Sequence, residues 1–307
     1  MRICVQNGGI TNRLGFDEGY RLIAEAGFEA IDWNIDVHLQ NDKVAKAPEL
    51  RDLCIFDKSL DEMLEFFAPE LDAIKRNGLQ IAQAHAPFGP FVNKRPEATE
   101  YYIEVYKNII KLCDTVGCKN LIIHSCVNHP VFGMTPAETF DLNMHLYGNL
   151  IDTLKQTDVT VCLENLFYTL GGKIREATCS DPHEAVEYID KLNALAGKEC
   201  FGLCVDTGHL MLLGRRFPIY MPIVGKRVKA LHIHDNDGLF DRHLAPFTGV
   251  TDWREFVDSL REIGYRGDLS FETFGQMYEG RIGTELMPMF AKHIADIGKY
   301  FRDKIIN

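Results

Sequence analysis

Four side chains that can bind a metal ion or move a proton each stand at the end of a short apolar run. These runs are VCLE, LCVD, ALHIH and LSFE, which end at Glu164, Asp206, His234 and Glu272. Short apolar runs of this kind are typical of buried parallel strands. A charge at the end of a buried strand costs free energy unless an opposite charge meets it there. Two glutamates, one aspartate and one histidine that converge therefore predict a divalent-metal site.

The ligand types narrow the choice of metal and of chemistry. Carboxylate and imidazole ligands without cysteine favour a catalytic Mn²⁺ or Zn²⁺, with Co²⁺, Mg²⁺ or Fe²⁺ as alternatives, over a structural Zn²⁺. Glu164 and Glu272 can also act as acid and base, because a carboxylate can ligate through one oxygen and move a proton with the other. A bound metal polarises a carbonyl, which makes an adjacent carbon-bound proton easier to remove.

Five more residues that can bind metal follow predicted strands. The motifs that hold them are AHAPF, IIHS, DTGH and DRH, and the residues are His85, His124, His209, Asp241 and His243. A single histidine at a strand end is more often a packed core residue than a ligand. Nine candidates on six consecutive strands are not explained by chance, so these five are predicted to contact further metal ions or the substrate.

Three other residues are predicted to lie near the site, and two of them keep two interpretations. Trp33 ends the second strand and either stacks on a sugar ring or packs in the core. Arg242 pairs either with a substrate oxygen or with a carboxylate. His232 lies two residues before His234 on the same strand face, so we expect it to line the interior as a supporting residue.

An alternation of apolar strands and amphipathic helices must position these residues. Eight strands are predicted, at Ile3–Asn7, Ala30–Ile35, Gln80–Pro87, Asn120–Cys126, Thr160–Leu166, Phe201–Asp206, Val228–Asp235 and Asp268–Phe274. Helices are predicted between them, for example at Leu60–Arg76, Ala98–Val116, Pro136–Lys155, Pro182–Leu195, Trp253–Ile263 and Glu285–Phe301. Glycines that can end a helix precede several strands, at Gly27, Gly78, Gly117 and Gly264.

Eight such units predict an α/β protein with one closed (β/α)₈ barrel, a TIM barrel, as a single domain over residues 1–307. The alternative is an open doubly wound sheet, which is disfavoured because no GxGxxG motif follows the first strand. Catalytic groups in a (β/α)₈ barrel come from the C-terminal ends of its strands, where all four ligands are predicted. Two long loops, at about 36–58 and 167–180, are lids, subunit contacts of a homo-oligomer or plain surface insertions.

Composition limits the partners and the compartment. The formal net charge of −11 argues against a protein that coats nucleic acid, because phosphate binding depends on Lys and Arg. No apolar run approaches the roughly 20 residues that a membrane span needs. The chain shows no signal-peptide pattern, and its nine cysteines include no CxxC pair. A cytoplasmic protein with reduced cysteines and a small-molecule, sugar-like substrate is predicted.

The order of the motifs HAPF, IIHS, LEN, DTGH, HIHDND, DRH and SFET resembles the xylose-isomerase-like TIM-barrel superfamily, over roughly residues 80 to 275. This superfamily contains sugar isomerases and epimerases, and also endonuclease IV, which cleaves DNA at abasic sites. For the epimerase-like members, the resemblance implies one divalent ion on Glu164, Asp206, His234 and Glu272. The two glutamates would then act as base and acid on opposite faces of an enediolate. For endonuclease IV, it implies three zinc ions on all nine candidates.

Some positions depart from these relatives. Where ketohexose 3-epimerases carry a substrate-binding Arg and Glu, this chain has Phe240 and Leu170. The mouth loops also lack a run of Lys or Arg that would bind a phosphate backbone. The sequence therefore favours an isomerase or epimerase of an unphosphorylated sugar or polyol. Abasic-site phosphodiester hydrolysis and eliminative cleavage of a 3-keto-glycoside, either a C- or an O-glycoside, remain the alternatives.

Overall fold

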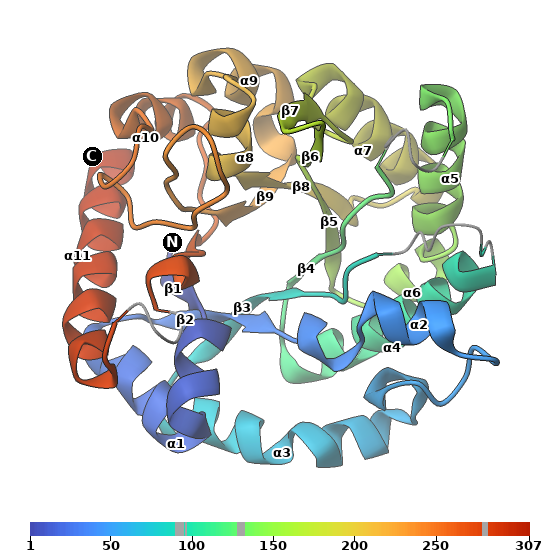
Figure 1. The fold of residues 1–307 in the computed structure, drawn as a ribbon, viewed down its shortest axis with the longest axis horizontal. Helices are drawn as coiled ribbons and strands as arrows, with labels where there is room; N and C mark the ends of the chain where they lie inside the picture. The colour runs from blue at the N-terminus through green and yellow to red at the C-terminus, as the bar shows by residue number, and fades with distance from the viewer. Residues whose placement is uncertain (90–94, 96, 128–132, 278–281) are drawn as a thin grey trace. The chain divides into compact units, whose positions relative to one another are not determined.

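A computed structural model describes the chain except residues 90–94, 96, 128–132 and 278–281 (Figure 1). Within the described residues, eight strands form one sheet in the order β10-β1-β2-β3-β4-β5-β8-β9. Their bounds are β1 Ile3–Gln6, β2 Ala30–Asn34, β3 Gln80–His85, β4 Asn120–Ile122, β5 Thr160–Glu164, β8 Phe201–Asp206, β9 Val228–His232 and β10 Leu269–Phe271. The predicted (β/α)₈ barrel class is confirmed.

Helices separate the strands along the chain. Those that the structure describes are α1 Gly8–Ala26, α2 Asn41–Lys46, α3 Leu60–Arg76, α4 Glu97–Val116, α5 Pro136–Gly148, α6 Ile151–Leu154, α7 Pro182–Ala196, α8 Thr207–Leu212, α9 Phe217–Val224, α10 Trp253–Glu262 and α11 Met287–Ile306. In the described ranges, no helix combines the length and the apolar character that crossing a membrane requires.

The chain divides into two compact units. The first unit comprises Met1–Trp33, Pro69–Ala82 and Cys204–Asn307, and the second comprises Asn34–Ala68 and Gln83–Leu203. The single domain expected over residues 1–307 stays a prediction.

In the first unit, β1 is the central strand and pairs in parallel with both β2 and β10. The ends of the strand order are also bonded to each other, because Ile233, just after β9, forms a parallel bridge with Phe271 of β10. The backbone N–H of Ile233 donates to the carbonyl of Ser270 at 2.8 Å, and that of Glu272 donates to the carbonyl of Ile233 at 3.1 Å. These bonds fix the residues that carry candidate ligands after β9 and β10.

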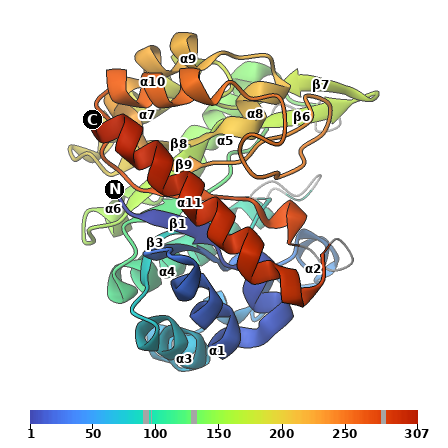
Figure 2. The same ribbon diagram turned by 90° about the vertical axis from the view of Figure 1, so that its left-hand side faces the viewer.

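Helix α11 covers β1 and β10 in this unit (Figure 2). Gly298, in the middle of α11, allows the close approach: a Cβ there would lie 2.4 Å from Ile3 Cγ2 and 2.9 Å from Phe271 Cε2. Ile3, Phe271 and Phe301 are fully buried. The absence of a side chain at Gly298 thus sets the distance between helix and sheet.

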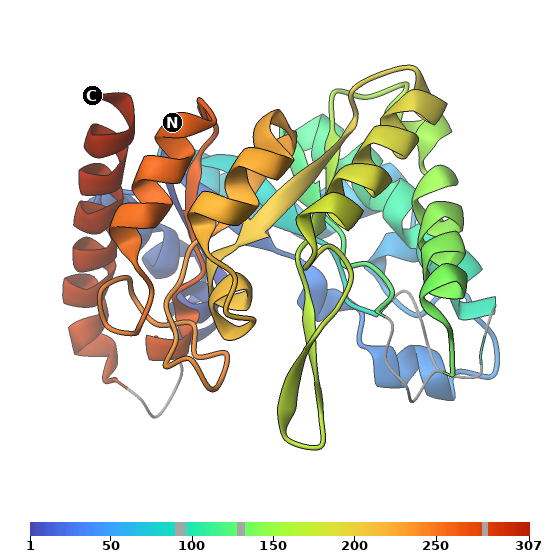
Figure 3. The ribbon, with the colours of Figure 1, turned by 90° about the horizontal axis from the view of Figure 1, so that it is seen from above.

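In the second unit, β4 pairs in parallel with β3 and with β5, in the registers His85↔Ile122 and Ile122↔Cys162. Directly after β5, residues Phe167–Leu170 (β6) and Lys173–Glu176 (β7) form an antiparallel hairpin, which is a two-stranded sheet of its own. Figure 3 shows this hairpin extending away from the strands of the unit. Gly171 and Gly172 form its two-residue turn with φ of 58° and 74°, as a type I′ turn requires.

The structure corrects several predicted boundaries. All the strands except β8, whose predicted bounds are confirmed, end earlier than predicted, so His124, His234 and Glu272 lie one or two residues beyond β4, β9 and β10. The predicted helix Pro136–Lys155 is divided into α5 and α6. The glycines at 27, 78, 117 and 264 all have positive φ and follow helices, which confirms their predicted role.

The packing of α11 gives a stability prediction. Gly298→Ala should lower the free energy of unfolding by about 1–3 kcal/mol, because the new methyl group overpacks the contact with Ile3 and Phe271. Gly148→Ala in α5 is the matched control, since a Cβ there meets no atom within 4 Å. The control should be neutral or stabilising by up to about 1 kcal/mol. Urea unfolding measures both, and a stabilised Gly298→Ala protein would show the prediction to be wrong.

Candidate metal centre

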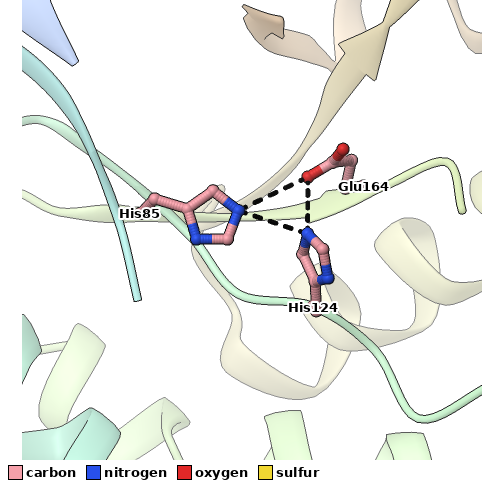
Figure 4. Close-up of side chains that lie close together, drawn as sticks. All are labelled: His85, His124 and Glu164. Atoms are coloured by element: carbon pink, nitrogen blue, oxygen red, sulfur yellow. Dashed lines mark hydrogen bonds and ion pairs between the residues drawn. The ribbon is translucent and has the colours of Figure 1, made fainter. Parts of the chain in front are cut away.

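Three predicted site residues of the second unit lie together (Figure 4). His85 ends β3, His124 follows β4 and Glu164 ends β5. Glu164 Oε2 lies 3.0 Å from His124 Nε2 and 3.8 Å from His85 Nε2, and the two Nε2 atoms are 3.2 Å apart. Glu164 and His85 are buried. The three ligand atoms lie within 4.8 Å of one another, a spacing that could hold a metal ion.

The protonation of His85 supports this interpretation. Its Nδ1 lies 2.9 Å from the carbonyl oxygen of Ala86, which can only accept a hydrogen bond. In the neutral ring, Nδ1 therefore carries the proton, and the lone pair of Nε2 faces the cluster. Metal-bound histidines usually hold their second ring nitrogen in this way, against a backbone carbonyl or a carboxylate.

A larger cluster lies in the first unit. Asp206 ends β8, His234 follows β9, and Asp241 and His243 lie in the loop after it. His234 Nε2 lies 3.0 Å from Asp206 Oδ2 and 3.8 Å from Asp241 Oδ1, and His243 Nε2 lies 3.0 Å from Asp241 Oδ2. His234, Asp241 and His243 form a second group whose ligand atoms lie within 4.8 Å of one another.

The histidines of this cluster repeat the arrangement of His85. His243 Nδ1 lies 3.0 Å from the carbonyl oxygen of Glu272, and His234 Nδ1 lies 3.4 Å from that of Asp235. In each ring Nδ1 faces the main chain and Nε2 faces a carboxylate. If such a ring is neutral and carries its proton on Nδ1, the lone pair of Nε2 points at the lone pairs of the carboxylate oxygen. A proton or a metal ion is therefore needed between Nε2 and the carboxylate.

The charges around His243 also favour a positive charge between this ring and the carboxylates. Burial lowers the pKa of His243, but its hydrogen bond to Asp241 and the charges of Glu272, Asp241 and Asp206 outweigh burial and raise the pKa to about 9. Burial raises the pKa of Asp241, yet His209 and His243 bring it well below its usual range. The carboxylates around His243 thus favour a positive charge on this ring at neutral pH.

Two more predicted residues join this cluster. The backbone N–H of His209 donates to Asp206 Oδ1 at 2.7 Å and so begins helix α8, and its ring Nε2 lies 3.5 Å from Asp241 Oδ2. Glu272 Oε2 lies 3.5 Å from His243 Nδ1. Six candidates therefore lie together in the first unit: Asp206, His209, His234, Asp241, His243 and Glu272.

A buried carboxylate that sequence reasoning missed anchors the loop that carries Asp241 and His243. Asp235 Oδ1 accepts from the N–H groups of Asn236 and Thr251, and Oδ2 accepts from Gly249 N–H and the indole of Trp253, all at 3.0–3.1 Å. A Cβ at Gly249 would lie 2.4 Å from Asp235 Oδ1. Four donors on one carboxylate close the loop at its base.

The structure places the remaining candidates differently. Arg242 donates to Asp237 Oδ2 at 2.9 Å and lies over the ring of Phe240, so it pairs with a carboxylate, one of its two predicted roles. Trp33 is fully buried in β2, where a packing role is favoured. His232 contacts Asp32, Asp206 and Glu272, as expected of a supporting residue. Asp32 was not predicted, although a carboxylate within the run AIDW was a signal for it.

The donor set fits a divalent metal. Carboxylate and imidazole ligands without a thiolate suit Mn²⁺ or Zn²⁺, the metals that the sequence favours. In the described part of the chain, Asp241 Oδ1 is buried and accepts no hydrogen bond, and it faces His234 Nε2 across 3.8 Å. A carboxylate oxygen and an imidazole nitrogen at this separation leave space for an ion about 2.0–2.2 Å from each.

The chain belongs to the xylose isomerase-like TIM barrel family, whose model matches residues 20–287. It is 22% identical to the D-psicose 3-epimerase of Enterocloster bolteae over 276 residues, covering 83% of this chain and 82% of the relative. It is also 22% identical to the inosose isomerase of Bacillus subtilis over 218 residues, covering 69% of this chain and 74% of the relative.

Solved structures show the same fold. A D-tagatose 3-epimerase-like protein superposes with a TM-score of 0.72 at 17% identity, over 100% of both chains. The IolI protein, crystallised with a bound zinc atom, superposes with a TM-score of 0.68 at 20% identity, over 99% of this chain and 98% of that one. At these identities the likeness establishes the fold.

The raised pKa of His243 predicts a pH-dependent stability for chelator-treated protein. The folded pKa of about 9 exceeds the ordinary 6.5. The extra stability is therefore complete below about pH 6.5 and is lost as the pH rises through 9. The loss should reach about 3 kcal/mol, read from urea unfolding at each pH.

His243→Asn is the control for this measurement. Asparagine tolerates the left-handed backbone at position 243, where φ is 49°, and it does not titrate in this range. The variant should show a flatter dependence on pH. Equal slopes for the two proteins between pH 6.5 and 9 would contradict the assignment to His243.

Proposed function

We propose that this protein is a divalent-metal-dependent isomerase or epimerase that moves a proton next to the carbonyl of a sugar-like substrate. The observation that carries the proposal is the repeated orientation of His85, His234 and His243, whose Nε2 atoms face carboxylates while Nδ1 faces the main chain. This orientation is that of metal ligands. The relatives named above, which are sugar epimerases and an inosose isomerase, support the choice of reaction.

Each glutamate has its own role in this proposal. Glu164 and Glu272 act as base and acid: one removes the proton from the carbon next to the carbonyl, and the other returns a proton to the enediolate. Glu164 and Glu272 are both buried, which keeps bulk water from competing for the proton. A divalent ion held by Asp206, His234 and the two glutamates would polarise the substrate carbonyl. We propose Mn²⁺ or Zn²⁺, and the zinc-bound IolI structure supports this choice.

The substrate is proposed to be an unphosphorylated sugar or polyol. Leu170, in the hairpin, and Phe240, beside Arg242, are both exposed apolar residues at the positions where ketohexose 3-epimerases carry Glu and Arg. Arg242 itself is paired with Asp237. Ketohexose 3-epimerisation is therefore disfavoured within the class. The nine cysteines, which form no disulfide among the described residues, support the proposed cytoplasmic location.

A second candidate is abasic-site phosphodiester hydrolysis. The groups His85–His124–Glu164 and His234–Asp241–His243 each offer three ligand atoms to an ion of their own. Such additional groups match the resemblance to endonuclease IV, in which nine corresponding residues bind three zinc ions. The metal content and the reaction decide between the candidates.

For the sugar enzyme we predict that one ion suffices. His124→Ala and Asp241→Ala should each leave one divalent ion bound per chain, because Glu164, Asp206, His234 and Glu272 remain. Asp206→Asn should lose it. Elemental analysis of protein purified without chelator gives the stoichiometry, and an empty site in either alanine variant would show the one-ion prediction to be wrong.

The reaction is tested by isotope exchange. Incubation in D₂O with ketopentoses, other ketoses and short hydroxy-carbonyl acids should place deuterium on the carbon next to the carbonyl of the true substrate. Glu164→Gln and Glu272→Gln should each reduce the exchange rate by at least about 10²–10⁴, the usual cost of losing an acid or a base. Asp42→Asn, an exposed carboxylate paired with Lys46, is the control and should exchange at the wild-type rate.

Other outcomes identify the alternatives. Turnover of an abasic-site DNA duplex, abolished by the same two substitutions and without deuterium uptake from any sugar, would establish the nuclease instead. Elimination from a 3-keto-glycoside would retain the proton transfer and change only the fate of the intermediate.

A further inference from the structure

A buried carboxylate on β2 is neither one of the proposed metal ligands nor one of the proposed acid and base groups. Asp32 is the charged residue of the strand AIDWN, and its side chain is fully buried. Burial of a carboxylate costs on the order of several kcal/mol unless its surroundings compensate. Ser270 Oγ of β10 donates to Asp32 Oδ2 at 3.4 Å, and His232 Nε2 of β9 lies 3.3 Å from the same oxygen. Asp32 therefore faces the same interior as the ends of β9 and β10.

His232 connects Asp32 to two proposed metal ligands. Its ring is 1% exposed, and on the side opposite Asp32 its Nδ1 lies 3.7 Å from Glu272 Oε2 and 4.0 Å from Asp206 Oδ2. One imidazole thus stands between the carboxylate of Asp32 and those of Glu272 and Asp206. All four residues belong to the first unit.

This arrangement has a recognised effect in metal centres. A carboxylate on one nitrogen of an imidazole fixes the ring, and the other nitrogen is then held toward the metal-binding groups. His232 is the last residue of β9, two residues before His234, and its contacts with Asp206 and Glu272 can restrict how far those side chains turn. Without it, two buried carboxylates that repel each other would separate when no ion is bound.

We propose that Asp32 and His232 form a buried positioning pair that holds Asp206 and Glu272 in the arrangement that binds the metal. The inference rests on the proposed metal site. Asp32 binds neither metal nor substrate in this assignment. It acts through His232, and its loss weakens metal binding without removing a ligand.

The experiment measures the affinity of the whole chain for Mn²⁺ and Zn²⁺, by competition with a chromophoric chelator. Asp32→Asn and His232→Gln should each weaken binding by about 10–100-fold, the usual effect of removing an outer partner of a metal ligand. Urea unfolding of the metal-free proteins checks that each variant folds. If Asp32→Asn does not fold, His232→Gln carries the test.

Glu70→Gln is the matched control. Glu70 is also a buried carboxylate of the first unit, but it accepts hydrogen bonds from Tyr20 at 2.5 Å and Asn7 at 3.2 Å. Its substitution should leave metal affinity unchanged. Wild-type affinity in Asp32→Asn or in His232→Gln overturns the proposal, and so does an equal loss in Glu70→Gln, which would reveal general destabilisation. A wild-type protein that binds neither ion overturns the proposed function together with this inference.

Discussion

The repulsion among buried carboxylates at the ends of parallel strands is the constraint on which the site depends. Asp206, Asp241 and Glu272 lie around two histidines in the first unit, and Glu164 lies beside two more in the second. Carboxylates in such surroundings are costly without a cation. The fold keeps Asp206, Glu164 and Glu272 in place because each stands on or directly after a strand, while Asp241 is held by the loop after β9. The buried carboxylates therefore lower the stability of the folded chain, and a bound cation would offset that cost.

Backbone carbonyls decide which nitrogen of each ring is available. The carbonyls of Ala86, Asp235 and Glu272 each face an Nδ1 atom, and all three belong to the short segments that follow barrel strands. Main-chain groups cannot be exchanged by mutation of a side chain. The orientation of the imidazoles is consequently a property of the barrel backbone as much as of the histidines.

The sequence predicted most of this arrangement, for identifiable reasons. Apolar runs that end in a charge locate Glu164 and Asp206 well, since a buried strand leaves few places for a carboxylate. The hairpin after Glu164 was expected only as a long loop, although Gly171-Gly172 between alternating residues is a hairpin signal. Asp32 was missed because its partners, His232 and Ser270, come from strands about 200 residues away, and only the folded chain brings them together.

The hairpin β6–β7 leaves one part of the protein free to change. Its two strands form a sheet separate from the barrel sheet, and its turn is exposed, so a longer arm would leave the ladder of the barrel strands intact. Doubling the length of a flexible loop costs only about 0.6 kcal/mol. The hairpin begins three residues after Glu164, so its inner end is tied to β5 while its tip is not. Natural or engineered insertions at the tip of the hairpin should therefore change the stability of the barrel little.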